Sequence, residues 1–329
     1  MGLLSLAIWM PIAFGVVLLA FGRDSQAGAV RWLALVGAIA SFLVTLPLIS
    51  GFQLGSSAMQ FVEKAMWFER FNVHYHLGVD GISLWLVPLT AFINVVVVIA
   101  GWEVITRKVN QYMAAFLILS GLMIGVFSAL DGILFYVFFE ATLIPMYLII
   151  GIWGGPNKIY AAFKFFLYTL MGSLLTLIAL IYLYTASNGS FDILTWHKLQ
   201  LSGTVQTLLF FAFFAAFAVK VPMWPFHTWL PDVHVEAPTG GSAVLAAIML
   251  KLGAYGFLRF SMPIAPDAAR EWGMFIIVLS LVAVVYVGLV AMVQQDMKKL
   301  VAYSSVAHMG FVTLGFFVFS DLGVSGAIV

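Results

Sequence analysis

The chain has 329 residues, of which 63% are hydrophobic and only 9% are charged, and its mean hydropathy is +1.08. This composition excludes a soluble globular domain, in which charged residues make up about a quarter of the chain. The formal net charge of +1 gives no reason to expect a nucleic-acid partner. Because cysteine is absent, the chain cannot form a disulfide, use thiol chemistry or hold an iron–sulfur cluster through thiolates.

Apolar stretches of about 20 residues recur along the sequence, which is typical of an all-α polytopic membrane protein. The first stretch has no basic region before it, so we expect a retained span and not a cleaved signal. No long soluble insertion separates the stretches, which predicts a single transmembrane domain over residues 1–329. The ten predicted spans lie near residues 3–22, 30–50, 80–102, 112–130, 132–151, 160–186, 205–234, 240–259, 272–293 and 299–320.

The only sizeable predicted loop covers residues 51–79. Within it, the partly alternating segment FNVHYHLGV predicts a short strand or hairpin that lies on the membrane surface.

The seventh span, 205–234, is predicted to be broken just after Lys220. Each proline removes a backbone donor and clashes with the preceding turn, so this span cannot continue as one regular helix. Broken helices at membrane depth are tolerated where they are packed in protein or line a wet cavity. The unwound turn is expected to leave backbone carbonyls free to solvate an ammonium group or a file of water. Four of the eleven prolines lie in the segment from Lys220 to Lys251, at positions 222, 225, 231 and 238.

Basic residues in the loops predict that the N-terminus lies on the outer side, because the inner loops then carry more of them. Only Lys220 and Lys251 fall outside the loops in this assignment. The eight inner basic residues are Arg23, Arg31, Arg107, Lys108, Lys158, Lys164, Lys298 and Lys299. The five outer ones are Lys64, Arg70, Lys198, Arg259 and Arg270.

Glu140 is the only one of the fourteen acidic residues that lies at the middle of a predicted span. A charge at the bilayer centre costs roughly 2.5–3.5 kcal/mol on insertion scales, so this carboxyl group must face a partner or water. Buried membrane charges are functional by default, and we favour that reading over a structural ion pair that only locks two helices.

Lys220 and Lys251 are the corresponding basic residues. Lys220 is expected at mid-depth because about two helical turns follow the break, although a lysine that snorkels to the interface is the alternative. Lys251 lies close to the middle of its span, one turn from Tyr255, with which it could share hydrogen bonds. Because burial disfavours charged lysine and a nearby carboxylate favours it, moving Glu140 relative to a lysine would load and release a proton.

His308 is predicted to share a helix face with Ser304 and Ser305. Histidine titrates near neutral pH and can shuttle protons. A histidine satisfied by a serine hydroxyl or a backbone carbonyl is an equally good interpretation.

Three residues are secondary candidates for a proton relay. His227 and His234 flank the break, where local capping is the favoured role, and Lys164 is favoured as an interfacial anchor. The sequence has no phosphate-binding glycine loop, no HExxH motif and no nucleophile elbow. We therefore expect this chain to bind no metal and no cofactor.

Several segments closely resemble the antiporter-like subunits of respiratory complex I, and the resemblance covers essentially the whole chain. The most specific segment is WPFHTWLPDVHVEAPTGGSAVLAAIMLKLGAYGFLRF. Three further matching segments are DGILFYVFFEATLIPMYLIIGIWGG, GPNKIYAAFKFFLYTLMGSLL and QQDMKKLVAYSSVAHMG.

The resemblance implies roles for four residues. Glu140 would be the acidic residue of the fifth span, which pairs with a lysine. Lys220 would be the lysine of the broken seventh span, and Lys251 the connecting lysine of the eighth. His308 falls at the histidine of a family motif in the tenth span.

Members of this family carry two inverted five-helix repeats. The resemblance implies N-terminal spans and a surface loop over residues 1–111, a first repeat over 112–259 and an incomplete second repeat over 260–329. A further apolar segment begins in the final residues, SDLGVSGAIV, so we expect the sequence to be part of a longer protein.

The resemblance also implies a function: a proton-translocating membrane-arm subunit of NADH:quinone oxidoreductase in the bacterial cytoplasmic membrane. Its partners would be other membrane-arm subunits, including antiporter-like neighbours, together with the lipid bilayer. FMN, iron–sulfur clusters and quinone are expected in other subunits. Two alternatives stay open. One is a subunit of a multi-subunit sodium/proton antiporter or membrane-bound hydrogenase of the same fold, and the other is a structural membrane spacer.

Overall fold

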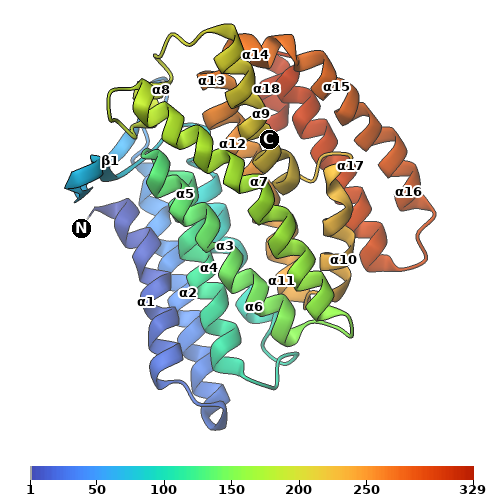
Figure 1. Cartoon of the computed structure of the whole chain (residues 1–329). Coiled ribbons are helices and arrows are strands. Elements are labelled where there is room, and N and C mark those ends of the chain that lie inside the picture. The colour runs from blue at the N-terminus through green and yellow to red at the C-terminus, as the bar shows by residue number, and fades with distance from the viewer. Residues whose placement is uncertain (1) are drawn as a thin grey trace. The chain divides into compact units, whose positions relative to one another are not determined.

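The computed structural model describes residues 2–329 and is mainly helical (Figure 1). Its α-helices are α1 (Leu3–Phe21), α2 (Ala27–Ser50), α3 (Leu86–Ala100), α4 (Val109–Ser128), α5 (Gly132–Ala141), α6 (Leu143–Trp153), α7 (Lys158–Ala186), α8 (Ile193–Trp196), α9 (Gly203–Lys220), α10 (Trp229–Glu236), α11 (Thr239–Val244), α12 (Leu250–Gly256), α13 (Met262–Ile264), α14 (Pro266–Glu271), α15 (Gly273–Val282), α16 (Gly288–Met292), α17 (Met297–Phe317) and α18 (Asp321–Ile328). The 3₁₀-helices are η1 (Asp24–Gln26), η2 (Glu69–Phe71) and η3 (Phe226–Thr228). The π-helical segments are η4 (Leu245–Met249), η5 (Phe257–Ser261) and η6 (Ala283–Val287), and the strands are β1 (Gln60–Phe68) and β2 (Val73–Val79).

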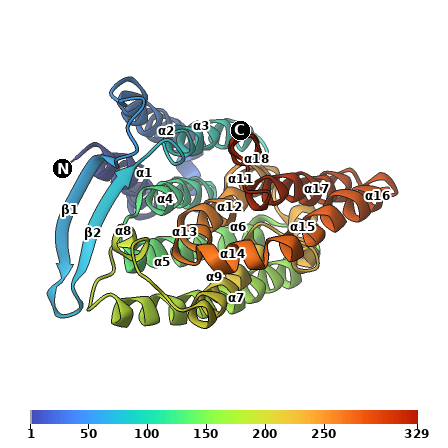
Figure 2. The ribbon, with the colours of Figure 1, turned by 90° about the horizontal axis from the view of Figure 1, so that it is seen from above.

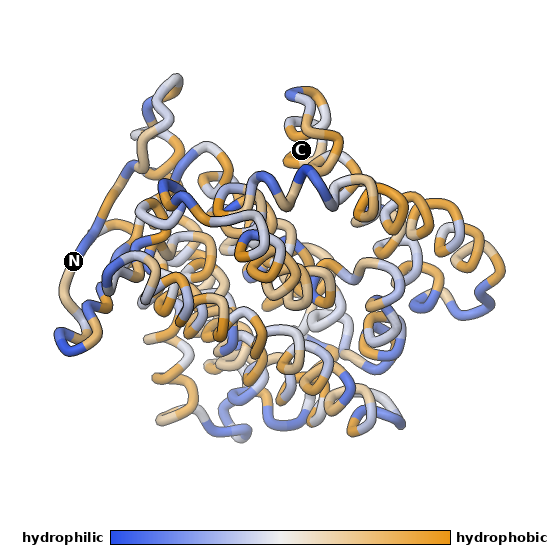
Figure 3. The backbone as a smooth tube through the Cα atoms, turned by 45° about the horizontal axis from the view of Figure 1, so that its top comes forward, coloured by the Kyte–Doolittle hydropathy of each residue, from blue (hydrophilic) through white to orange (hydrophobic). Residues whose placement is uncertain are grey.

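Within residues 2–329, nine helical stretches are long and apolar enough to cross a membrane, which confirms the prediction of an all-α polytopic membrane fold. Figure 3 shows hydrophobic residues along the helices and hydrophilic residues mainly in the connections. The predicted span 80–102 is represented by α3, an apolar helix of only 15 residues. It begins late because the Asp80 carboxylate accepts hydrogen bonds from the backbone N–H groups of Ile82 and Ser83, which holds that stretch in turns.

The chain divides into two compact units. Unit 1 comprises the described residues up to Trp153 together with Pro238–Ile248, and unit 2 comprises Gly154–Ala237 and Met249–Val329. The helical stretch Thr239–Ile264, which contains α11 to α13, carries the chain from unit 1 into unit 2.

Unit 1 is a helical bundle, drawn mainly in blue to teal in Figure 1. Helices α1 to α4 pack on one another, α5 and α6 pack against α4, and α11 packs against α3. Most of the side chains of α4 are buried, so α4 forms the centre of this unit.

The loop 51–79 contains an antiparallel hairpin, seen from above as a curved ribbon in Figure 2. Its strand β2 confirms the strand predicted within FNVHYHLGV, whereas the partner strand β1 lies before that segment and was not predicted. Strands β1 and β2 pair from Gln60 opposite Val79 to Phe68 opposite Val73. The Glu63 carboxylate of β1 accepts a hydrogen bond of 2.8 Å from the backbone N–H of Leu4 in the first turn of α1. An acidic group is favourable at a helix N-terminus, so this contact ties the hairpin to α1.

Unit 2 contains the broken span and is drawn from green to red in Figure 1. Helix α9 packs against α7, α12 and α14, while α10 contacts both α7 and α17. Helices α15 and α16 pack against α17. The aromatic side chains of α9, including Phe210, Phe213 and Phe217, fill the centre of this unit.

Candidate functional site

The predicted break after Lys220 is confirmed. Helix α9 ends at Lys220, and residues 221–225 form turns before η3 and α10 continue the chain for about two helical turns. The break follows from the local sequence, because Pro222 cannot donate a backbone hydrogen bond to the last turn of α9.

Two carbonyls in the last turn of α9, just before the break, are occupied by hydrogen bonds. The carbonyl of Ala218 accepts a hydrogen bond of 2.8 Å from the backbone N–H of Met223. The carbonyl of Val219 accepts one of 2.9 Å from the indole N–H of Trp229 in α10. The chain folds back over the end of α9, so these two acceptors are occupied by the protein itself.

Lys220 lies in a closely packed, mostly aromatic environment and is only 2% exposed. Its Nζ atom lies 5.8 Å from the centre of the Phe165 ring on α7, within the range of a cation–π interaction. The Phe165 ring in turn packs against Trp229, with 5.5 Å between ring centres. Gly253 of α12 allows the helix to approach closely, because a Cβ atom there would lie 2.9 Å from the Cβ atom of Lys220.

Lys251 lies in α12, two residues after the π-helical segment η4, and is half-buried. Short π-helical segments inserted in α-helices are rare and occur frequently at functional sites. Periodicity gave no sign of this segment, since one extra residue in a uniformly apolar helix leaves the hydrophobic pattern almost unchanged.

Tyr255 and Arg259 form a second feature of the same helical stretch. The Tyr255 hydroxyl accepts a hydrogen bond of 3.1 Å from Nε of Arg259, whose guanidinium also lies 5.1 Å from the Tyr255 ring centre. Arg259 is only 5% exposed, so its assignment to an outer loop is wrong. Lys164, assigned to an inner loop, likewise lies inside a helix, α7.

Glu140 lies in unit 1, in the last turn of α5, and is partly buried. The helix is interrupted two residues later at Thr142, whose hydroxyl donates a hydrogen bond of 2.7 Å to the carbonyl of Phe139. Thr142 keeps right-handed helical dihedral angles, and Gly132–Trp153 forms one membrane-length helical stretch, so the irregularity is confined to this residue.

Asp131 caps the helix that carries Glu140. Its carboxylate accepts hydrogen bonds of 3.0 and 3.1 Å from the backbone N–H groups of Ile133 and Leu134, and one of 3.0 Å from that of His74 in β2. The side chain is buried, and this burial raises the pKa of Asp131 to about 6 against the opposing effect of the three hydrogen bonds. Asp131 therefore joins the hairpin to the start of α5.

His308 is exposed on α17, a regular helix. The hydroxyl groups of Ser304 and Ser305 both donate hydrogen bonds of 2.9 Å to the carbonyl of Val301. Both serine hydroxyls thus donate within α17, and the histidine ring is accessible on the surface of unit 2.

The secondary candidates lie around the break in unit 2. His227 and His234 are both buried, and the His227 ring lies 6.4 Å from that of Tyr303 in α17. Nζ of Lys164 forms an ion pair of 2.6 Å with the carboxylate of Asp232 in α10. Spacing along one helix could not reveal this pair, because the two residues are 68 positions apart.

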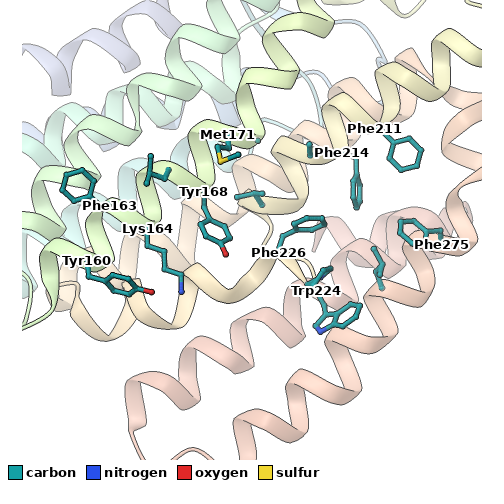
Figure 4. A pocket seen from close by; sticks show the side chains of 16 residues that line it. Tyr160, Phe163, Lys164, Tyr168, Met171, Phe211, Phe214, Trp224, Phe226 and Phe275 are labelled. Carbon is teal, nitrogen blue, oxygen red and sulfur yellow. The ribbon is translucent and has the colours of Figure 1, made fainter.

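Figure 4 shows Lys164 on the wall of a cavity of about 1230 Å³ in unit 2, between the side chains of Tyr160 and Tyr168. Its Nζ atom lies 5.6 Å from the Tyr160 ring centre and 6.0 Å from that of Tyr168. The remaining lining is mainly aromatic and aliphatic, with Trp224 and Phe226 contributed by the break. Lys164 is thus paired and shielded, in contrast to a lysine that simply reaches the interface.

Unit 2 thus contains Lys220, Lys251 and His308, whereas Glu140 belongs to unit 1. Among residues 2–329 there is no cluster of three or more histidine, cysteine, aspartate or glutamate side chains that could hold a metal ion.

A model of the family described as NADH:quinone oxidoreductase/Mrp antiporter, transmembrane, matches residues 129–329. The chain is 54% identical to NADH-quinone oxidoreductase subunit M of Rhodobacter capsulatus, over 99% of this chain and 66% of that protein. It is 47% identical to NADH-ubiquinone oxidoreductase chain 4 of Chondrus crispus, over 95% of this chain and 64% of that protein. The chain thus spans about two thirds of the length of these relatives.

The fold matches a chain in the structure of respiratory complex I from Thermus thermophilus with bound NADH. The TM-score is 0.87 at 31% sequence identity, over 99% of this chain and 67% of that chain. The sequence form HVEAPTGGS, together with PMYLIIGIWGG, resembles subunit M of bacterial NADH:quinone oxidoreductase, the counterpart of mitochondrial subunit 4, and these matches confirm that resemblance.

Proposed function

This chain belongs to the NADH:quinone oxidoreductase/Mrp antiporter transmembrane family, and we propose that it acts as a proton-translocating membrane-arm subunit of an NADH:quinone oxidoreductase. Electrons would pass from NADH to quinone in other subunits, which would hold the FMN and the iron–sulfur clusters. The partners of this chain would be the neighbouring membrane-arm subunits, including other antiporter-like ones.

One observation carries the proposal: a lysine that is 98% shielded lies at the point where a membrane helix breaks. An ionisable group at membrane depth is costly, and such residues mark ion paths and proton relays. The aromatic rings and the glycine around Lys220 provide a low-dielectric environment, in which small changes in nearby charge shift its proton affinity strongly.

The proposed relay consists of Glu140, Lys220, Lys251 and His308. A signal from neighbouring subunits would alter the pairing of Glu140 with a lysine. Lys220 would then change its protonation state and pass a proton towards Lys251 and His308. The break after Lys220 supports the assignment of this lysine, and the π-helical segment before Lys251 supports that of Lys251.

The placement in the membrane is also part of the proposal. We assign the chain to the bacterial cytoplasmic membrane, with its N-terminus outside and the hairpin on the membrane surface. Residues 112–259 would form the first five-helix repeat and residues 260–329 the start of the second, after N-terminal spans and a surface loop over 1–111.

The test compares Lys220→Ala with wild type in the full-length protein, within the purified complex reconstituted in proteoliposomes. Both preparations are matched for assembled complex, and proton uptake is measured with NADH and quinone. We expect pumping to be lost while assembly is retained. Unchanged pumping per electron would contradict the proposal and leave Lys220 as a structural residue.

The family description itself names a second candidate, a subunit of an Mrp-type antiporter. Neighbouring genes for quinone-reducing modules favour the oxidoreductase, whereas neighbouring genes for antiporter subunits favour this second candidate. A purely structural spacer would instead show reduced assembly in Lys220→Ala and normal pumping in the complex that does assemble.

A further inference from the structure

The half-helix α10 is joined to α7 by a row of three polar contacts. Thr228, Asp232 and Glu236 follow one another at intervals of four residues, so they share one face of η3 and α10. Their partners on the N-terminal side of α7 run in the opposite order along the chain. We call this row the polar ladder: Thr228 Oγ1 to the Tyr168 hydroxyl at 3.1 Å, Asp232 to Lys164 Nζ at 2.6 Å, and Glu236 Oε2 to the backbone N–H of Asn157 at 2.8 Å.

The polar ladder is connected to the environment of Lys220 through Phe165 and Trp229. Phe165, the residue after Lys164, presents its ring to the Lys220 ammonium and to Trp229. Trp229 is the first residue of α10, and its indole N–H is bonded to the carbonyl of Val219 at the end of α9. A shift of α10 along α7 would therefore disturb the contact of Trp229 with Phe165, whose ring faces Lys220, and the hydrogen bond of Trp229 to Val219, the residue before Lys220.

Helix α10 depends on such contacts for its position. It has only eight residues, and a helix of this length is not stable on its own in water. Its C-terminal end is held from another helix, since Nζ of Lys298 in α17 donates hydrogen bonds of 3.2 and 3.0 Å to the carbonyls of Val235 and Ala237. A cation is favourable at that end of a helix.

The ion pair is the central and strongest contact of the polar ladder. The Lys164 side chain is 18% exposed and lies between the rings of Tyr160 and Tyr168, so solvent screens it less than it would a surface pair (Figure 4). The Asp232 side chain is more open, at 39% exposure. Breaking the pair would thus leave a shielded ammonium without its counter-charge.

We propose that Lys164 and Asp232 are positioning residues for the proton relay: their ion pair fixes the half-helix α10 against α7 and thereby fixes the aromatic environment of Lys220. This inference rests on the proposed function of Lys220 and assigns Lys164 a role other than that of a proton carrier. The charge pair is what matters, so reversing its polarity should retain most of the effect.

The test uses the full-length protein in the assembled complex, with protons pumped per electron as the readout. Lys164→Met and Asp232→Asn are each expected to lower this ratio about tenfold, the middle of the range for coupling effects of this kind. Lys164→Arg and the double exchange of Lys164→Asp with Asp232→Lys are expected to restore most of it.

A proton carrier would not tolerate arginine, which stays protonated, so loss of pumping in Lys164→Arg would overturn the proposal. Lys198→Met, at an exposed lysine, is the matched control and should behave as wild type.

A second measurement reports on α10 itself. The chain has no cysteine, so Leu230→Cys places one thiol of this chain on a fully buried position of α10. We expect maleimide labelling of this thiol to rise when Lys164→Met is added and to stay at the parent level when Lys198→Met is added. Equal labelling in the two backgrounds would overturn the proposal.

The two proposals fail separately. If Lys220→Ala leaves pumping intact, the relay assignment fails, while the labelling result still shows whether the polar ladder positions α10. If Lys220→Ala abolishes pumping but Lys164→Met changes neither pumping nor labelling, the relay stands and the positioning role is wrong.

Discussion

Two helix interruptions in this molecule carry an ionisable residue, and they are built in different ways. In unit 1, α5 gives way to α6 at a single residue, Thr142, and Glu140 lies in the turn before it. In unit 2, α9 ends at Lys220 and five residues of turn, including two prolines, precede η3. The first is a one-residue irregularity at which Thr142 keeps helical dihedral angles, and the second arises from residues that cannot continue a helix at all.

The difference lies in how each interruption is stabilised. The one at Thr142 is local, because the threonine hydroxyl and the Phe139 carbonyl belong to the same turn. The one at Lys220 depends on distant residues, since Trp229 supplies the donor for Val219 and α7 holds α10. We infer that the position of Lys220 responds to movements of the neighbouring helix α10.

We expect the greatest loss of pumping from a substitution at Glu140. Glu140→Gln removes the charge and keeps the shape, so we expect pumping in the assembled complex to fall by at least about tenfold, as for loss of a positioned acid–base group. Glu140→Asp should retain part of the activity because it keeps the carboxylate. Glu103→Gln, at an exposed acidic residue before α4, is the control and should leave pumping unchanged. Normal pumping in Glu140→Gln would mean that Glu140 takes no part in proton transfer and that only the break at Lys220 is functional.

The sequence was sufficient to predict the features that depend on local composition. Long apolar stretches predicted the spans, prolines predicted the end of α9 at Lys220, and alternation predicted the strand β2. Each of these is determined within about twenty residues, so no knowledge of the packing was needed.

The features that the sequence could not predict depend on packing between distant segments. The ion pair of Lys164 and Asp232 and the bond from Trp229 to Val219 exist only because α10 folds back on α7 and α9. Burial of Arg259 and exposure of His308 likewise depend on which face of each helix meets a neighbour, and apolar residues on all faces of a membrane helix conceal that choice.

The hydrogen bond from Trp229 to the carbonyl of Val219 should contribute to the stability of the folded protein. Trp229→Phe keeps a ring beside Phe165 and removes the donor to the Val219 carbonyl. We expect a loss of about 1–3 kcal/mol in the free energy of unfolding, the cost of leaving a buried acceptor unsatisfied. Trp272→Phe is the matched control, because its buried Nε1 has no hydrogen-bond partner among residues 2–329, and it should be close to neutral. Equal thermal shifts for the two variants would show that the Trp229 bond does not stabilise the break.

The helix α5, which carries Glu140, should also depend on its N-cap residue, Asp131. Asp131→Ala removes the N-cap of α5 and the acceptor for His74, and an N-cap substitution of this kind costs about 0.5–2 kcal/mol. Hydrogen exchange of the Ile133 and Leu134 amides should accelerate in the variant. Asp321→Ala, in the first turn of the exposed helix α18, should leave exchange at these amides unchanged. Unaltered exchange in Asp131→Ala would mean that the cap does not hold the start of α5.

The stability that Asp131 contributes should also depend weakly on pH. Burial raises the pKa of Asp131 to about 6, above its ordinary value of 3.8, so the folded state binds the proton more tightly than the unfolded state. The stability contributed by the protonated form is therefore complete below about pH 4 and is lost as the pH rises through about 6. Exchange of the hairpin amides near His74, corrected for the intrinsic rate, should thus increase between pH 5 and pH 7, conditions that bracket that pKa. Asp131→Asn cannot titrate and should flatten this profile, whereas the slope should persist in the control His74→Gln, because the carboxyl group is retained. If hydrogen exchange in Asp131→Asn still depends on pH, another group causes this dependence. The protonation of Asp131 would then not control the stability of the hairpin.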